Sequence, residues 1–175
     1  IRLNPEEYSI QNSLGYVYFL NKEHQKAIES YTRSLKLYSQ DPKVYFNRGN
    51  VYRDSNNLQA ALADMNEAIY LAPAYTEAYT NRGSIYLSLA DYASALKDFN
   101  QAIKLDPNYT IAYYNRALAC LQTGDFQLAE KDLNQVIVNN PEIIASYELR
   151  GLIYFQMEQY QKAIEDWQTY LKHVP

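Results

Sequence analysis

The sequence has a single cysteine, Cys120, so an intramolecular disulfide is excluded. Only five glycines and six prolines are present, and no evenly spaced alternating strands lie between turn residues, which argues against an all-β sandwich. No apolar stretch approaches the roughly 18 residues of a membrane span, and no basic-then-apolar leader opens the chain. We therefore expect no membrane partner for this segment.

A strong charge of one sign is also missing. Sixteen Lys and Arg residues stand against twenty Asp and Glu residues, which gives a net charge of −4, and neither sign forms a long run. A basic surface for phosphate backbones is not expected, so we expect no nucleic-acid partner. The hydrophobic content of 47% with 21% charged residues excludes a disordered chain, so the segment is expected to fold.

The sequence does contain a repeat. The peptide YFNRGNVY at residues 45–52 returns as YTNRGSIY at 79–86, as YYNRALAC at 113–120 and as YELRGLIY at 147–154, each time 34 residues on. A fixed period of this length, filled with helix-forming residues, is typical of a helical solenoid. We predict an all-α solenoid of antiparallel helix hairpins over residues 1–175, with repeats at 8–41, 42–75, 76–109, 110–143 and 144–175.

Each repeat is predicted to hold two helices. In the third, they run from about Thr76 to Leu89 and from about Ala93 to Leu105, and a proline ends the second. On this lattice residues 1–7 are predicted to be the tail of a preceding second helix, and the chain an excised piece of a longer array. The prolines of the lattice are Pro5, Pro73, Pro107, Pro141 and Pro175.

Small residues are predicted to mark the crossing point of each hairpin, because two helices approach closely only where side chains are small. One position is small in every repeat, and a second, twelve residues later, is always alanine. The first set is Gly15, Gly49, Gly83, Ala117 and Gly151, and the second is Ala27, Ala61, Ala95, Ala129 and Ala163.

Four repeats place an arginine 16 residues before an aspartate. We predict ion pairs inside each hairpin, in preference to arginine ligands for an acidic partner, because buried charges are usually paired. The first repeat replaces both members together, with Leu14 and Ser30, which favours pairing. The predicted pairs are Arg48–Asp64, Arg82–Asp98, Arg116–Asp132 and Arg150–Asp166.

The third repeat carries, in order, Tyr79, Gly83, Tyr86, Ala95, Phe99, Ala102 and Pro107, and this pattern resembles the tetratricopeptide repeat (TPR). The resemblance covers the whole chain and is weakest in the first repeat. It implies a right-handed superhelical solenoid whose first helices line a concave groove that holds an extended or helical peptide. Most members of the family are non-catalytic adaptors or scaffolds, so the implied partner is a protein or peptide.

If the groove lies where the resemblance implies, a row of amides follows it. Asn47, Asn81 and Asn115 occupy equivalent points one repeat apart, and amides can hydrogen-bond a peptide backbone without choosing its sequence. The alternative is that these amides are solvated or bridge to the next hairpin. The other predicted peptide-binding residues are Asn12, Lys43, Phe46, Asn50, Glu77, Thr80, Ser84, Tyr114 and Leu118, with Tyr16, Arg53, Glu148 and Leu152 on the same faces.

The predicted groove becomes more apolar around Tyr114, Leu118 and Leu152, which suits a ligand with one apolar anchor. The alternative is that the two leucines pack between neighbouring repeats. One TPR subclass clamps a C-terminal carboxylate with basic residues. That set is not reproduced here, because Glu77 and Ile111 occupy points where the clamp would have a cation.

Catalysis has little support in the sequence. His24 and His173 are far apart in repeat order and neither has an expected partner, while Cys120 replaces an interhelical tyrosine and is predicted to be a buried small hydrophobe. No Gly-rich phosphate loop, metal-spaced cluster or Gly-flanked nucleophile is present. We expect no catalytic residue, no metal site and no cofactor.

Two further functions remain open at this level. Trp167, Tyr170 and Leu171 should form an uncovered apolar end, which would favour self-assembly, for instance as a homodimer through the C-terminal helix. Alternatively, the array recruits substrates for a larger enzyme.

Overall fold

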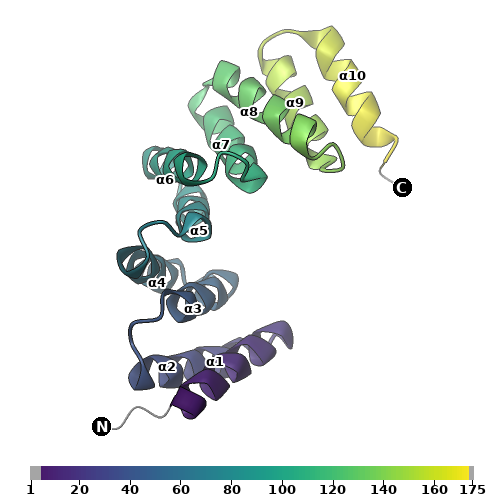
Figure 1. Cartoon of the computed structure of the whole chain (residues 1–175). Coiled ribbons are helices and arrows are strands. Elements are labelled where there is room, and N and C mark those ends of the chain that lie inside the picture. Colours follow the sequence, from purple (N-terminus) through teal and green to yellow (C-terminus); the bar gives the residue numbers. More distant parts are fainter. Residues whose placement is uncertain (1–4, 174–175) are drawn as a thin grey trace. The chain divides into compact units, whose positions relative to one another are not determined.

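The computed structural model describes residues 5–173, and in this range the chain forms ten α-helices and no strand (Figure 1). The predicted all-α helical repeat solenoid is therefore confirmed as the fold class. The helices are α1 (Pro5–Leu20), α2 (His24–Leu37), α3 (Pro42–Asp54), α4 (Leu58–Leu71), α5 (Thr76–Ser88), α6 (Tyr92–Leu105), α7 (Thr110–Thr123), α8 (Phe126–Asn139), α9 (Ala145–Gln156) and α10 (Tyr160–Leu171).

The chain divides into two compact units, residues 1–85 and residues 86–175, with the division inside α5. In the N-terminal unit α1 packs on α2 and α3 packs on α4, while α2 also contacts α3. In the C-terminal unit α7 packs on α8 and α9 on α10, while α6 contacts α7 and α8 contacts α9. Helix hairpins, each packed on the next one along the chain, thus build both units. No helix within residues 5–173 has the length and apolarity needed to cross a bilayer.

The turns inside the hairpins share one backbone device. The residue at one repeat position has a positive φ in every hairpin, although only one of the five is glycine. In three hairpins the next residue, Asn57, Asp91 or Asp125, caps the following helix by accepting a hydrogen bond from a backbone amide. The positive-φ residues are Lys22 (60°), Asn56 (59°), Ala90 (57°), Gly124 (79°) and Glu158 (58°).

The helix boundaries differ slightly from the predicted ones. α5 ends at Ser88 instead of Leu89, and α6 begins at Tyr92 instead of Ala93, because the Asp91 side chain caps the helix one residue earlier. Prolines at 73, 107 and 141 follow the ends of α4, α6 and α8, as predicted.

Pro5 is the first residue of α1. A proline fits the first turn because its missing N–H would have no helical partner there, and Glu6 and Glu7 complement the positive end of the helix dipole. Residues 5–7 therefore belong to the first hairpin, which differs from their predicted place in an earlier helix. Residues 1–4 of that predicted tail lie outside the described residues.

The core of each unit is formed where a second helix lies between its own first helix and that of the next hairpin. In the N-terminal unit, Tyr31 and Leu35 of α2 cluster with Val44 and Val51 of α3. In the C-terminal unit, α8 plays the same role between α7 and α9, through a cluster of Ala117, Cys120, Ala129, Leu133, Leu149 and Ile153. Second helices therefore hold neighbouring hairpins together, and first helices keep one face for other contacts.

The predicted close approach at the small residues holds at Gly49. A Cβ atom there would lie 3.5 Å from the carbonyl oxygen of Ala61 and 2.9 Å from Cε of Met65. Gly151 instead accommodates a ring, because a Cβ atom on it would lie 2.5 Å from Nε1 of Trp167. The small position in these hairpins thus also makes room for the large side chain sixteen residues later.

Three of the four predicted Arg–Asp pairs are present. In each, Nε and Nη2 of the arginine donate to the two carboxylate oxygens of an aspartate sixteen residues on, at 2.7–2.8 Å. The aspartate side chains are 6%, 1% and 7% exposed, so these pairs are largely shielded from water. The pairs are Arg48–Asp64, Arg116–Asp132 and Arg150–Asp166. The Arg82–Asp98 pair stays a prediction.

Candidate functional site

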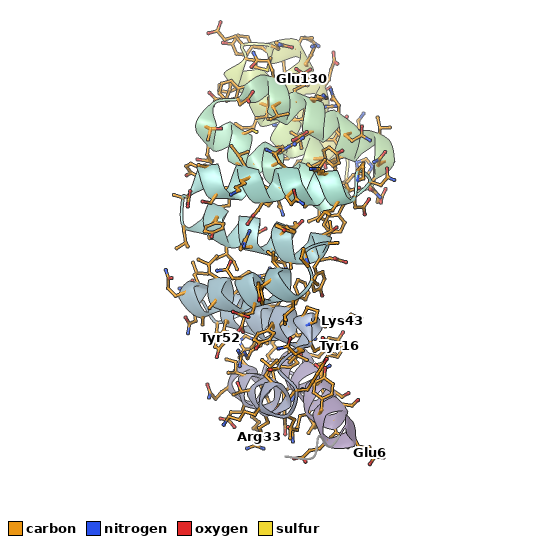
Figure 2. All side chains as sticks on the ribbon, turned by 60° about the vertical axis from the view of Figure 1, so that its left-hand side comes forward. Glu6, Tyr16, Arg33, Lys43, Tyr52 and Glu130 are labelled. Carbon is orange, nitrogen blue, oxygen red and sulfur yellow. The ribbon has the colours of Figure 1, made fainter. Side chains whose placement is uncertain are left out.

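The predicted peptide-binding residues of the N-terminal unit lie on its first helices, α1, α3 and α5. Lys43 is exposed and Tyr16 is 52% exposed; both are labelled in Figure 2. Phe46 is partly covered, because its ring lies against that of Tyr75 with centroids 5.0 Å apart. Packing within the protein therefore already uses part of this surface.

The amide row is partly engaged as well. Nδ2 of Asn81 on α5 donates to Oδ1 of Asn50 on α3 at 2.8 Å, so this amide bridges two hairpins. That bridge was the alternative that the sequence left open. Asn47 of α3 and Asn115 of α7 hold the same repeat position, and their contact with a peptide stays a prediction.

Thr80 departs from the predicted site. Its side chain is 1% exposed, and its hydroxyl donates to the carbonyl oxygen of Thr76 at 3.1 Å. A hydroxyl that donates to a carbonyl of the preceding turn is already engaged within its own helix. Thr80 is therefore removed from the residues that would touch a peptide. The hydroxyl of Ser84 makes the same bond, to the carbonyl of Thr80 at 2.9 Å. Glu77 is exposed. Oδ1 of Asn12 is buried and has no hydrogen-bond partner within residues 5–173.

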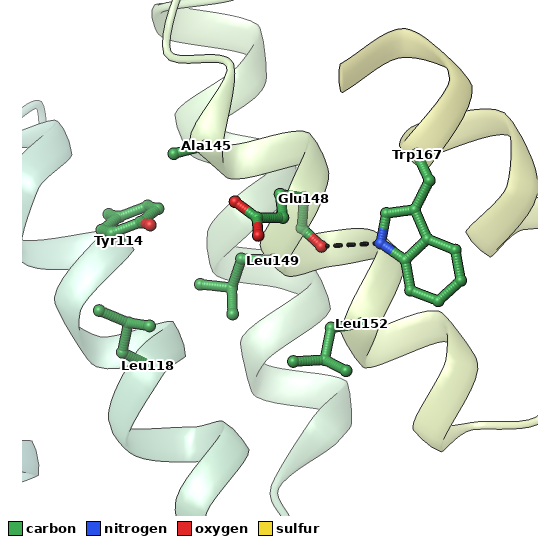
Figure 3. A pocket seen from close by; sticks show the side chains of 7 residues that line it. All are labelled: Tyr114, Leu118, Ala145, Glu148, Leu149, Leu152 and Trp167. Carbon is green, nitrogen blue, oxygen red and sulfur yellow. Dashed lines mark hydrogen bonds between the residues drawn. The ribbon is translucent and has the colours of Figure 1, made fainter. Parts of the chain in front are cut away.

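In the C-terminal unit, α7, α9 and α10 line a cavity of about 320 Å³ that is open to solvent (Figure 3). Two of its lining residues were predicted to bind a peptide, and Glu148 and Leu152 were expected on the same faces. Three others were missed: Ala145, Leu149 and Trp167. The complete lining is Tyr114, Leu118, Ala145, Glu148, Leu149, Leu152 and Trp167.

Helical spacing explains how the cavity forms. Tyr114 and Leu118 are one turn apart on α7, and Glu148 and Leu152 are one turn apart on α9, so each pair shares a helix face. The leucines stand at the repeat position that is Asn50 in the second repeat and Ser84 in the third, which makes this part of the chain apolar. The small side chain of Ala145 stands where the second to fourth repeats have Lys43, Glu77 and Ile111.

Trp167 forms one wall of the cavity and is held in place. Its Nε1 donates to the carbonyl oxygen of Glu148 at 3.2 Å, as the dashed line in Figure 3 marks. The ring packs on Gly151, and its centroid is 6.0 Å from that of Phe155. Trp167 is the single tryptophan of the chain, so it also reports on this cavity spectroscopically.

The charge at the cavity comes from Glu148. Its side chain is exposed, its carboxylate makes no ion pair within residues 5–173, and Figure 3 shows the group between α9 and Tyr114. Burial, and secondly the charge of Glu148, raise the pKa of the Tyr114 phenol, which keeps it neutral. The cavity thus combines apolar walls, one neutral hydroxyl and one negative charge.

The other chemically active side chains have structural roles. Cys120 is fully buried in the α7–α8–α9 cluster, and burial raises the pKa of its thiol to about 11, so it is protonated at neutral pH. The expectation that the histidines lack partners was wrong: Nδ1 of His24 lies 3.1 Å from Oγ of Ser55, and Nδ1 of His173 donates to the carbonyl of Thr169 at 2.9 Å. The described residues contain no group of three potential metal ligands.

Sequence models of one repeat family match the chain in five places. Four are described as the tetratricopeptide repeat and match residues 42–75, 76–109, 99–131 and 144–172. A fifth, described as the TPR repeat, matches residues 15–52. Tetratricopeptide repeat protein 36 of Caenorhabditis elegans is 40% identical over 52 residues, which are 30% of this chain and 29% of that relative. The match therefore spans less than a third of the relative's length.

Solved structures share the fold. MamA superposes with a TM-score of 0.85 at 23% identity over 96% of this chain and 92% of that one. A tetratricopeptide repeat protein from Parabacteroides merdae ATCC 43184 gives 0.84 at 26% identity over 98% and 67%. YrrB, a TPR protein with an unusual peptide-binding site, gives 0.79 at 20% identity over 97% and 87%.

Proposed function

We propose, because this chain belongs to the tetratricopeptide repeat family, that it is a protein-interaction module whose odd-numbered helices, together with α10, hold a peptide segment of a partner protein. Membership of this family supports a role as a protein-interaction scaffold. The cavity between α7, α9 and α10 is the single observation that supports peptide binding. We propose that this segment acts by binding and not by catalysis.

The cavity suits one anchoring side chain of a partner. Its volume of about 320 Å³ lies at the lower end of the range typical of ligand pockets. Leu118, Leu149 and Leu152 offer apolar contact, while the Tyr114 hydroxyl can bond a peptide backbone. A hydrogen bond already fixes the Trp167 side chain. Ligand binding would therefore cost little further conformational entropy at this residue.

The N-terminal unit has candidate contacts of its own on its first helices. Lys43 and Glu77 are exposed on α3 and α5, and we propose that they contact a partner of that unit. The amides of Asn47 in this unit and Asn115 in the C-terminal unit are proposed to bond a peptide backbone. Asn81 would have to exchange its bond to Asn50 for one to the peptide.

The experiment is selection from phage-displayed random 12-residue peptides. We expect the native chain to enrich a set of related peptides, and the Leu118→Asp/Leu152→Asp variant to lose them. Val138→Asp is the matched control, because Val138 is 77% exposed on α8 and is not part of this cavity. Circular dichroism verifies that each variant is folded. Enrichment that survives in the double variant would place binding elsewhere, and no enrichment by the native chain would remove the proposal.

Self-assembly is a second candidate, favoured by the register of two exposed faces. Ile10 and Val17 of α1 are each 58% exposed, whereas Val44 and Val51, at the same repeat positions of α3, are fully buried against α2. On α10, Ile164 is 45% and Leu171 67% exposed. These two stand at the repeat positions by which Ile28 and Leu35 of α2 pack on α3. We propose as this alternative that α10 of a second copy docks on α1 as α2 docks on α3.

A head-to-tail contact of this kind can continue from copy to copy. Light scattering should then give a mass that rises with concentration, and Val17→Glu or Ile164→Glu should each give monomers. Mixing the two variants should restore dimers only, since each keeps one intact face. A monomeric native chain at all concentrations would contradict this alternative.

A further inference from the structure

We infer that the cavity of the C-terminal unit selects a partner segment with a basic side chain two residues away from its apolar anchor. This inference rests on the proposed function and gives it a chemical preference. It is carried by the position of Glu148 beside Leu152 and by the pairing of the neighbouring charges.

Among the seven lining residues, Glu148 carries the only formal charge. The nearby phenol of Tyr114 stays neutral, because burial and the Glu148 carboxylate both raise its pKa. A basic side chain entering here therefore meets a negative group with no cation already bound to it. An acidic side chain would meet repulsion.

The neighbouring cation on α9 does not offset this charge, because Arg150 is committed to other groups. Its Nε and Nη2 donate to Asp166 at 2.7 Å, and its Nη1 donates to Oδ1 of Asn134 at 2.7 Å. The pair is self-neutralising and turned toward α8 and α10. The charge of Glu148 is therefore the one that a ligand in the cavity would meet.

The spacing of the basic group follows from helix and strand geometry. Glu148 and Leu152 are separated by one helical turn, which places their Cβ atoms about 5–6 Å apart. In an extended peptide, side chains of residues i and i+2 point to the same side and are roughly 6.6 Å apart. An apolar anchor over Leu152 thus brings a cation two residues away to Glu148, as Leu-x-Lys or as Lys-x-Leu, depending on chain direction.

The size of the effect is limited by solvent. Exposed ion pairs contribute little, so Glu148 should govern selectivity while the apolar walls supply most of the affinity. We expect the basic peptide to bind about three- to tenfold more tightly than its acidic counterpart at low salt, and the ratio to shrink as salt is added.

The test uses synthetic ten-residue peptides with a Ser and Gly background that carry Leu-Ser-Lys, Lys-Ser-Leu, Leu-Ser-Glu, Glu-Ser-Leu or Ser-Ser-Lys. Their dissociation constants are measured from the fluorescence of Trp167, the single tryptophan of the chain. With the native protein, a basic leucine peptide should bind most tightly. With Glu148→Lys the acidic leucine peptides should become the tighter ones, and with Glu148→Gln the two classes should bind alike.

Glu158→Lys is the matched control. It changes the net charge by the same amount but lies in a hairpin turn, where its φ of 58° matches the φ of 60° of Lys22 at the equivalent position. The peptides should rank by dissociation constant for this variant as they do for the native chain.

The outcomes separate the two levels of the proposal. Leucine peptides that bind alike whatever their charge, or an order unchanged by Glu148→Lys, would overturn the selection inference and leave the proposed function intact. Failure of all the peptides to alter the fluorescence of Trp167 or to bind by calorimetry would overturn both.

Discussion

Arg116 and Asp132 are joined by two parallel hydrogen bonds across the α7–α8 hairpin, from Nε and Nη2 to the two carboxylate oxygens, each 2.7 Å long. The third nitrogen, Nη1, donates to Oδ1 of Asn100 on α6 at 2.5 Å. One guanidinium thus ties its own hairpin to the preceding one. The same three-way contact recurs at Arg150, with Asp166 and Asn134. These bonds support a structural role for the arginines.

The first prediction concerns this ion pair. Arg116→Ala should lower the free energy of unfolding by about 3–5 kcal/mol, because it leaves the buried Asp132 without its partner. The double variant Arg116→Ala/Asp132→Ala should lose clearly less than the sum of the two single variants, since the second change removes the stranded charge. Urea denaturation of the three variants measures the coupling. Additive losses would show that the two side chains do not stabilise one another.

The second prediction concerns the packing of Trp167 on Gly151. Gly151→Ala puts a methyl group 2.5 Å from Nε1 of Trp167, so the ring must move and its bond to the Glu148 carbonyl is weakened. We expect a loss of about 1–3 kcal/mol and a shifted fluorescence maximum.

The α7–α8 hairpin provides the control for this change, since it combines Ala117 with Leu133 at the same two repeat positions. Gly151→Ala/Trp167→Leu should therefore recover much of the stability lost by Gly151→Ala alone. If Gly151→Ala is as stable as the native protein, the Trp167 ring is not tightly packed on residue 151.

A third prediction follows from the hairpin turns. Ala90 has φ of 57°, a conformation that costs a residue with a side chain about 1–2 kcal/mol and costs glycine almost nothing. Ala90→Gly should raise the free energy of unfolding by about 0.5–1 kcal/mol after the entropy of glycine is included. Ala63→Gly, at an exposed position inside α4, should instead lower it by about 1 kcal/mol. Thermal denaturation distinguishes the two signs, and a destabilising Ala90→Gly would contradict the strained turn.

A fourth prediction concerns the Cys120 thiol. Its pKa of about 11 in the folded protein, against 9.0 for an exposed thiol, lowers the thiolate fraction at pH 8 by roughly 100-fold. Labelling by an aromatic disulfide at pH 8 should be at least that much slower in buffer than in urea. Because the folded pKa is the higher one, stability from this group is present below about pH 9 and is lost as the pH rises to about 11. Rapid labelling without denaturant would contradict a buried thiol.

The repeat period alone predicted the hairpins and the three Arg–Asp pairs, since residues facing each other across antiparallel helices have a nearly constant sum of positions. It misassigned residues 5–7, which belong to α1, because a proline can begin a helix as well as follow one, and sequence spacing does not distinguish the two. It also missed the partner of His24, since the bond to Ser55 joins two different hairpins.

The sequence predicted the site residues that share one face of a single helix, but not those that a second helix contributes. Tyr114 and Leu118 follow from periodicity, but Trp167 lies on a second helix, and its place in the cavity depends on how α10 packs over Gly151. Thr80 shares the repeat position of Tyr114 and is nevertheless buried, and its hydroxyl donates to a carbonyl of its own helix. A signal for the cavity was present in Ala145, the one small residue at its repeat position in the last four repeats.

The most direct test of the central claim is a titration followed by two-dimensional nitrogen–proton NMR, with a Leu-Ser-Lys peptide added to the labelled chain. The single indole N–H of Trp167 and the amides of Leu118 and Leu152 should shift together and saturate with one dissociation constant. Shifts confined to helices outside the cavity, such as α8, with the indole signal unmoved at saturation, would contradict the account.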